Sequence, residues 1–287
     1  MLRGVGLFIA FFASLATASA QDEIPSASRL KSIVDGKVIR IAYRSDATPF
    51  SFTGGSNAPV GYSIDVCKLV VKSIEEQFGL PDVKIEWVPV TVQTRFSTIV
   101  DGKADMECGS STVSLQRMKD VDFSNITFVE STGIVVTRAS NIHGFAEMAG
   151  KKIAVIAGST NERAVMGQIR EHNLSTTIVA VKDRDAGIAA LEAGEVDGYA
   201  SDKLLLLGAQ LKHPETLAML PDDLSIEPYG IALPRGDWAL RLAVNTGLAR
   251  IYRSGQIVPV YKVWFAQVGL QPGVLLRAAY TLGGLSE

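Results

Sequence analysis

The chain has 287 residues, with 28 lysines and arginines against 30 aspartates and glutamates, for a formal net charge of −2 at pH 7. This near balance, without a basic stripe, argues against a nucleic-acid-binding protein. The length suits about two domains of roughly 100–150 residues, which are large enough to fold without disulfides.

The first twenty residues have the three-part layout of a secretory signal peptide. Arg3 precedes an apolar run over Val5–Leu15, and small residues follow up to Ala20. The apolar run is shorter than the ~20 residues that a spanning helix needs, which argues against a membrane anchor. Gln21 offers no sulfur for lipid attachment, and no later segment is long and apolar enough to span a membrane. We therefore expect export, with cleavage after Ala20.

Short β-rich runs then alternate with amphipathic stretches, which predicts an α/β fold with mostly parallel sheets. A first unit has the order strand, helix, strand, helix, strand over Val38–Tyr43, Ser63–Phe78, Lys84–Val88, Arg95–Val100 and Ala104–Cys108. A second unit repeats this order over Lys152–Ile156, Asn161–His172, Thr177–Val181, Asp185–Ala193 and Gly198–Ala200.

Two further β-rich stretches, Thr127–Thr137 and Ile226–Leu233, bracket the second unit and predict a chain that crosses to a second lobe and returns. Predicted helices over Trp238–Ser254 and Val258–Val268 would pack back on the first lobe. For Gln271–Glu287 we expect only packing or a mobile tail.

These elements predict two lobes with a central sheet in each and a ligand cleft between them, because ligands of open α/β sheets bind beyond the carboxyl ends of the strands. The predicted boundaries are 1–20 for the signal peptide, 30–132 and 231–287 for lobe 1, 133–230 for lobe 2, and hinges near 130–136 and 227–232.

The two cysteines, Cys67 and Cys108, could form a disulfide in an exported protein. Cys67 also falls on an apolar stripe of helical spacing, where a buried thiol is simply a small hydrophobe. Because geometry decides the pairing, both states stay open. The histidines, His143, His172 and His213, lack metal-ligand spacing, so we expect neither a zinc site nor a cofactor.

The segment Glu107–Arg117 follows directly on a predicted strand and is rich in hydroxyl groups. Ser110 and Thr112 supply hydroxyls, and Arg117 supplies a guanidinium that can grip a carboxylate with two parallel hydrogen bonds. An ordinary polar loop with a surface arginine has the same composition, so the segment by itself leaves both interpretations open.

A second candidate anion site lies at Ser159 and Thr160, where a predicted strand gives way to a helix. Ser159 with Glu162 fits a capping box, which explains the residues without any ligand. A capped helix start still leaves backbone N–H groups that can hold an anion, and Thr160 could add its hydroxyl. Capping and binding are compatible.

Three charged residues end predicted strands or begin helices on the side of the cleft. Asp202 either caps the next helix or accepts hydrogen bonds from a ligand ammonium group. Arg44 and Arg95 lie at strand-to-helix connections, where the alternative to binding is a solvated surface charge.

In order and spacing, these motifs resemble the periplasmic solute-binding proteins of polar amino-acid ABC importers, most closely the glutamate/aspartate branch. The resemblance runs from about Leu30 to about Phe265. It rests on Pro49–Phe52, Gly61–Asp65, Thr94–Phe96, Gly102–Arg117, Val121–Ser124, Lys152–Thr160, Leu191–Asp202 and Tyr229–Ala232.

The resemblance implies a two-lobed Venus-flytrap fold, a location in the periplasm, and delivery of L-glutamate or L-aspartate to an inner-membrane ABC permease by a monomer. It also implies that Arg117 and Thr112 hold the ligand α-carboxylate, helped by Ser110 and by the turn at Ser159 and Thr160.

By the same resemblance, Asp202 would hold the α-ammonium group, and Arg44 and Arg95 would contact the side-chain carboxylate. Two positions depart from the pattern: Val92 replaces a frequent hydroxyl, and Arg184 stands where some relatives place a histidine at the ligand. Arg184 would add positive charge, and the two departures leave glutamate versus aspartate open.

Other functions stay open from the sequence. The site could bind another polar amino acid, or the chain could resemble the periplasmic cyclohexadienyl dehydratases, with Asp202 or Glu107 as a proton donor. We expect no enzyme, because no Ser-His, Cys-His or paired-carboxylate arrangement has motif support. A sensory domain would usually continue into a transmembrane helix.

Overall fold

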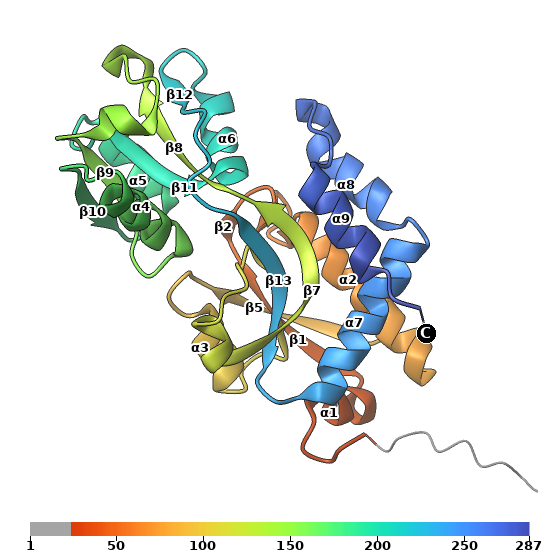
Figure 1. Cartoon of the computed structure of the whole chain (residues 1–287). Helices are drawn as coiled ribbons and strands as arrows, with labels where there is room; N and C mark the ends of the chain where they lie inside the picture. The colour runs from red at the N-terminus through yellow and green to blue at the C-terminus, as the bar shows by residue number, and fades with distance from the viewer. Residues whose placement is uncertain (1–23, 287) are drawn as a thin grey trace, which may run out of the picture.

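Residues 24–286, which the computed structural model describes, fold into two α/β lobes, as predicted (Figure 1). The predicted signal peptide lies outside the described residues. Within the described range, the helices are all too short or too polar to cross a membrane. Apolar clusters fill both faces of the central sheet in each lobe.

The described part of the first lobe has a five-stranded sheet in the order β5-β1-β6-β13-β7. Within it, β1 pairs in parallel with β5 and β6, while β13 runs antiparallel to β6 and β7. The strands are β1 (Val38–Arg44), β5 (Lys84–Val90), β6 (Met106–Glu107), β7 (Val121–Glu130) and β13 (Glu227–Pro234). Arg44 therefore ends β1 rather than following it.

Helices from both ends of the described chain cover this sheet, so the C-terminal helices lie against the strands of the first lobe. They are α1 (Arg29–Gly36), α2 (Tyr62–Phe78), α3 (Arg95–Val100), α7 (Trp238–Arg253), α8 (Ile257–Phe265) and α9 (Val274–Gly283). A small sheet of β2 (Asp46–Ala47), β3 (Ser51–Thr53) and β4 (Pro59–Val60) lies between β1 and α2.

The apolar stripe predicted for α2 is buried against this sheet, and Cys67 lies on it. Cys67 forms a disulfide with Cys108, which decides the question that the sequence left open. The two cysteines are 41 positions apart. Closing a loop of that length stabilises a fold by about 4 kcal/mol in the chain-entropy model. The bridge also ties α2 to the hydroxyl-rich segment that follows β6.

The last helix, α9, packs on the first lobe and is not a mobile tail. The Tyr280 hydroxyl lies 2.6 Å from the Tyr62 hydroxyl, which also donates to the Thr127 carbonyl at 2.8 Å. Next to it, Phe265 of α8 packs on Phe128 of β7 with ring centroids 5.2 Å apart. These aromatic contacts hold the C-terminal helices against the strand that leads to the second lobe.

The second lobe repeats the arrangement of the first in the sheet order β10-β9-β11-β8-β12, with β8 antiparallel to both its neighbours. Its strands are β8 (Thr132–Thr137), β9 (Lys152–Ile156), β10 (Thr177–Val181), β11 (Gly198–Asp202) and β12 (Leu217–Met219). Its helices are α4 (Thr160–Glu171), α5 (Arg184–Glu192) and α6 (Lys203–Lys212).

The chain crosses between the lobes twice, and the two crossings lie side by side (Figure 1). On the outward crossing, β7 ends at Glu130 and β8 begins at Thr132. On the return, β13 begins at Glu227, whose Cα pairs with that of Glu130. Two glutamates therefore face each other in the ladder where the lobes meet.

Candidate functional site

The cleft between the lobes brings the predicted site residues together. Seven of the nine line one small cavity there, namely Arg44, Arg95, Ser110, Ser159, Thr160, Arg184 and Asp202. Thr112 adjoins it through a contact between its hydroxyl oxygen and that of Thr160, at 3.2 Å. Arg117 joins through Thr112, to whose carbonyl it donates at 2.7 Å.

Arg44, at the end of β1, is already paired. Its Nε and a terminal nitrogen donate to the two carboxylate oxygens of Asp46 at 2.7 and 2.8 Å, in a two-pronged ion pair. Burial alone would raise the pKa of Asp46, but the hydrogen bond and charge of Arg44, with the charge of Arg184, bring it below its ordinary value. Much of the positive charge of Arg44 is therefore neutralised within the protein.

Arg95, at the start of α3, has no such partner. Its side chain is 3% exposed, and it makes no ion pair within residues 24–286. One terminal nitrogen donates to the Ser110 carbonyl at 3.3 Å, while Nε has no hydrogen-bond partner in the described chain. Burial lowers the pKa of Arg95 because a charged group is costly away from water.

Arg117 is the second buried arginine without a described carboxylate partner. Its guanidinium carbon lies 5.1 Å from the centre of the Phe96 ring, and that of Arg95 lies 4.8 Å from the same centre. Burial, with the like charges of Arg95 and Arg163, lowers the pKa of Arg117 to about 9, so the guanidinium stays charged at neutral pH. Buried charges are normally paired. Arg95 and Arg117, two buried charges without a described carboxylate partner, therefore create a site suited to an anion.

The start of α4 forms the facing wall, and Ser159 caps it as predicted. The Ser159 hydroxyl accepts from the Glu162 backbone N–H at 3.0 Å. The carboxylate of Glu162 reaches back to the N–H of Gly158, at 2.8 Å, rather than to that of Ser159 as a capping box requires. The capping hydrogen bonds therefore reach back to Gly158, one residue further than predicted. Thr160 is the first residue of α4, and it lines the cavity.

Asp202 ends β11 and is the N-cap residue of α6, but in the described structure its side chain makes no capping hydrogen bond. The carboxylate accepts instead from the Asn161 side-chain amide at 2.8 Å. Burial raises the pKa of Asp202 to about 6, although the nearby Tyr229 and Asn161 oppose the shift. The group faces the cavity as an acceptor that a cationic donor would stabilise.

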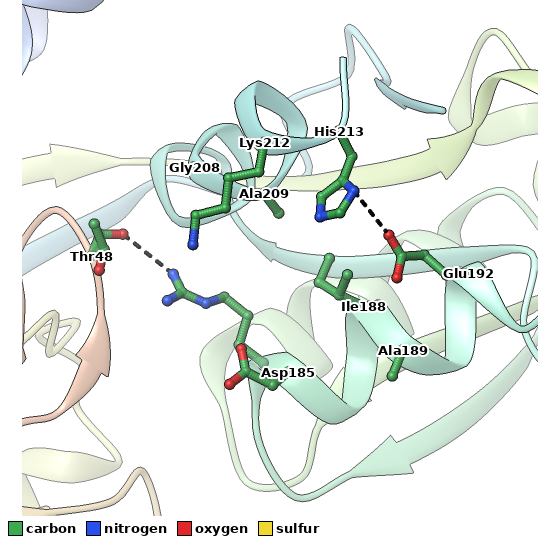
Figure 2. A pocket seen from close by; sticks show the side chains of 10 residues that line it. Thr48, Asp185, Ile188, Ala189, Glu192, Gly208, Ala209, Lys212 and His213 are labelled. Carbon is green, nitrogen blue, oxygen red and sulfur yellow. Dashed lines mark hydrogen bonds and ion pairs between the residues drawn. The ribbon is translucent and has the colours of Figure 1, made fainter. Parts of the chain in front are cut away.

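Arg184, the first residue of α5, spans the two lobes. It donates to the Thr48 carbonyl of the first lobe at 3.3 Å and to the Leu205 carbonyl of α6 at 3.4 Å. Figure 2 shows a second pocket that Arg184 lines, where Lys212 extends toward Thr48 and His213 faces Glu192. Arg184 therefore lines both the cleft cavity and this second pocket.

Two further acidic residues lie near the site, and the sequence had named only Glu107 of them, as a possible proton donor. Glu107 is fully buried, and neither of its carboxylate oxygens has a hydrogen-bond partner within residues 24–286. Burial raises its pKa, against the opposing charge of Arg95. Glu227 accepts from the Thr112 hydroxyl at 2.6 Å. A charged residue inside a predicted strand was the one sequence signal for either position.

Among residues 24–286, no group of three or more histidine, cysteine, aspartate or glutamate side chains is arranged to hold a metal ion. The cavity offers hydrogen bonding and charge. Guanidinium groups, hydroxyls and a helix start lie beside two carboxylates, of which Asp46 is paired with Arg44 and Asp202 is not in an ion pair within the described residues.

Comparison with known proteins places this geometry in context. The model of the bacterial extracellular solute-binding proteins, family 3, matches residues 39–267. A relative from Pseudomonas aeruginosa, the L-glutamate/L-aspartate-binding protein, is 32% identical over 83% of this chain and 80% of its own length. The glutamate/aspartate import solute-binding protein of Escherichia coli is 29% identical over 90% and 86%.

A solved structure shares the fold at a TM-score of 0.72 and 26% identity, covering 83% of this chain and all of the other. It is described as an ancestral amino acid-binding protein that is a precursor of cyclohexadienyl dehydratase.

Proposed function

The chain belongs to the bacterial extracellular solute-binding proteins of family 3, and from that premise we propose that it captures an acidic L-amino acid, glutamate or aspartate, for an ABC import permease. The names of the two relatives above support this ligand, and that of the Escherichia coli relative also supports a role in import.

The observation that carries the proposal is the pair of buried guanidinium groups, Arg95 and Arg117, without a carboxylate partner in the described chain. A buried charge left unpaired costs several kcal/mol, so such a pair favours a ligand that brings negative charge. A dicarboxylate amino acid brings two carboxylates. A neutral or basic amino acid would leave one guanidinium unmatched.

The ligand would lie with its α-carboxylate toward Arg117, Ser110, Thr112 and the start of α4. Thr112 and Thr160 would offer their backbone N–H groups, because the Thr112 hydroxyl hydrogen is donated to Glu227 and the Ser159 N–H to the Ile156 carbonyl. Its side-chain carboxylate would face Arg95, with Arg44 and Arg184 as additional positive charge.

Asp202 would accept the α-ammonium group, since it is a buried carboxylate with one described donor, Asn161. Capture requires that both lobes contact the ligand at once, so a closed form is selected over an open one. Movement would occur at the hinges predicted near 130–136 and 227–232, between lobe 1 (30–132 and 231–287) and lobe 2 (133–230).

We assign the protein to the periplasm as a monomer that meets the permease by diffusion, after removal of residues 1–20. The match to extracellular solute-binding proteins and the import role in the name of the Escherichia coli relative support this location.

Thermal denaturation of the mature protein tests the ligand. At about one hundred times Kd, a true ligand stabilises the folded state by about 2.7 kcal/mol and raises the melting temperature. We expect that shift with L-glutamate or L-aspartate. A shift with neutral or basic amino acids and none with either acidic one would contradict the proposal.

An enzyme on this scaffold is the second candidate, because the fully buried Glu107 has no described hydrogen-bond partner and the ancestral neighbour is a precursor of a dehydratase. We expect no turnover of prephenate or arogenate to an aromatic product. Formation of such a product by the wild type but not by Glu107→Gln would establish the enzymatic function.

A further inference from the structure

A ring of hydrogen bonds runs through the point where the lobes meet. Glu227, at the start of β13, is 3% exposed and accepts at both carboxylate oxygens. Oε2 accepts from the Thr112 hydroxyl at 2.6 Å. Oε1 accepts from Ser225 at 2.6 Å and from Thr132, the first residue of β8, at 3.3 Å. One carboxylate thus joins the loop after β6 to both hinge connections.

The ring closes through the second lobe. The Asn161 side-chain amide donates to the Thr132 hydroxyl oxygen and to Asp202, both at 2.8 Å. Asn161 follows Thr160, whose hydroxyl oxygen lies 3.2 Å from that of Thr112. The circuit therefore passes from Glu227 through Thr132, α4 and Thr112 back to Glu227, and only the contact between Thr112 and Thr160 crosses the open side of the cleft.

The number of available hydroxyl hydrogens decides which threonine is the donor in the contact between Thr112 and Thr160. A threonine hydroxyl has one hydrogen to donate, and a carboxylate has none. Because Thr112 donates to Glu227, its oxygen must act as an acceptor toward Thr160 and the cleft. Hydrogen bonds to a charged acceptor are stronger than neutral ones, so Glu227 holds Thr112 firmly in this orientation.

We propose that Glu227 is a positioning residue that couples ligand capture to closure of the lobes. It does not line the cavity itself and acts by orienting Thr112 while holding Thr132 at the hinge. This inference rests on the proposed function, since it assumes that closure over a ligand is the working step. Glu227→Gln replaces the charged acceptor of Thr112 by a neutral amide that can also donate, so Thr112 is no longer held in one orientation and the closed form is weakened.

The chain supplies a matched control in Glu130, the Cα partner of Glu227 in the hinge ladder. Glu130 is also buried, but its described hydrogen bond goes to the Ser131 backbone N–H, at 3.0 Å, and it stays outside the ring. Glu130→Gln therefore changes a buried hinge side chain without touching Thr112. Because burial raises the pKa of Glu130 to about 8, this variant removes little charge at pH 7, and it separates a general effect of altering the hinge ladder from the specific effect of breaking the ring.

The test measures Kd and the association and dissociation rates of L-glutamate for the full mature protein. We expect Glu227→Gln to weaken binding about tenfold, because a hydrogen bond to a charged group is lost. The loss should lie mainly in faster dissociation, and Glu130→Gln should stay within about threefold of wild type by the same scale. If Glu227→Gln binds as tightly as Glu130→Gln, the inference is wrong.

A double-mutant cycle distinguishes positioning from simple destabilisation. In a Thr112→Val background, Glu227→Gln should raise the Kd less than about twofold. In a Thr112→Ser background, which keeps the hydroxyl, Glu227→Gln should raise the Kd as much as it does in wild type. Additive losses would overturn the inference. If Glu227→Gln fails to fold, Ser225→Ala weakens the same carboxylate from its other oxygen, and the same non-additivity with Thr112→Val is expected.

Failure of the proposed function would give a different result from failure of the inference about Glu227. In that case wild type itself would bind neither acidic amino acid. The cycle is then run with whichever amino acid shifts the melting temperature, and the contrast between positions 227 and 130 decides the inference in the same way.

Discussion

The two walls of the cleft balance their charges in different ways. The wall from the first lobe holds Arg95 and Arg117 without a described carboxylate partner, although Arg44 beside them is bridged to Asp46. The wall from the second lobe holds Asp202, whose carboxylate accepts from Asn161. A count of arginines therefore says little about specificity. The arginines without a described carboxylate partner are the ones with which a ligand anion can form an ion pair.

Loss of an unpaired arginine should have the largest effect. We expect Arg95→Met to weaken binding of L-glutamate by more than about a hundredfold, since removing one partner of a buried charge pair costs about 2–5 kcal/mol. Binding of a neutral amino acid should be spared. Isothermal titration checks both, and an unchanged affinity for L-glutamate would show that the first wall does not bind the side-chain carboxylate.

The second wall is tested at Asp202. Asp202→Asn should weaken binding of L-glutamate by about thirtyfold or more, because the ligand ammonium loses its buried counter-charge. Glutarate lacks that ammonium and should bind the variant no more weakly than it binds wild type. A parallel loss for glutarate would place the role of Asp202 in the fold rather than at the ligand.

Lowering the pH should weaken ligand binding through protonation of Asp202. Burial raises the pKa of Asp202 to about 6, so the free protein protonates this group as pH falls from 7 to 5. A protonated Asp202 cannot neutralise an ammonium group, and the Kd for L-glutamate should rise about tenfold over this window. In Asp202→Asn the Kd should be flat between pH 7 and 5. An equal rise in the variant would assign the pH dependence to another group.

Arg44→Met should have the smallest effect and sharpens the contrast within the first wall. Arg44 already shares its charge with Asp46, which is 31% exposed and can be solvated when its partner is removed. We expect a loss of about three- to tenfold, in the range of one partly screened charge contact. A loss as large as that of Arg95→Met would mean that the ion pair with Asp46 opens for the ligand.

Much of the fold follows from the sequence because its signals are local. The helical stripe through Cys67 and the two alternating units are visible in the order of residue types, and the structure confirms them. The helix α9 and the strand β12 are short, and their packing depends on partners that are distant in sequence, such as Tyr62 for Tyr280. The last segment therefore had no specific prediction.

The candidate site, like the fold, could be predicted from the sequence only in part. Motifs identified the nine candidate residues, and the structure gathers all of them at the cleft. Their partners could not be predicted, because Asp46, Asn161 and Glu227 act through contacts that only folding creates. The ring at Glu227 joins residues up to 115 positions apart, so no spacing in the sequence announces it.

The most direct test of this account is isothermal titration of the mature protein with L-glutamate and L-glutamine in parallel, and with L-aspartate and L-asparagine in parallel. Each pair has nearly the same shape and differs in one side-chain charge. The account predicts tight binding of at least one acid and binding of its amide weaker by a hundredfold or more, for the loss of one buried charge contact. Equal affinity for acid and amide, or preference for the amide, would contradict it.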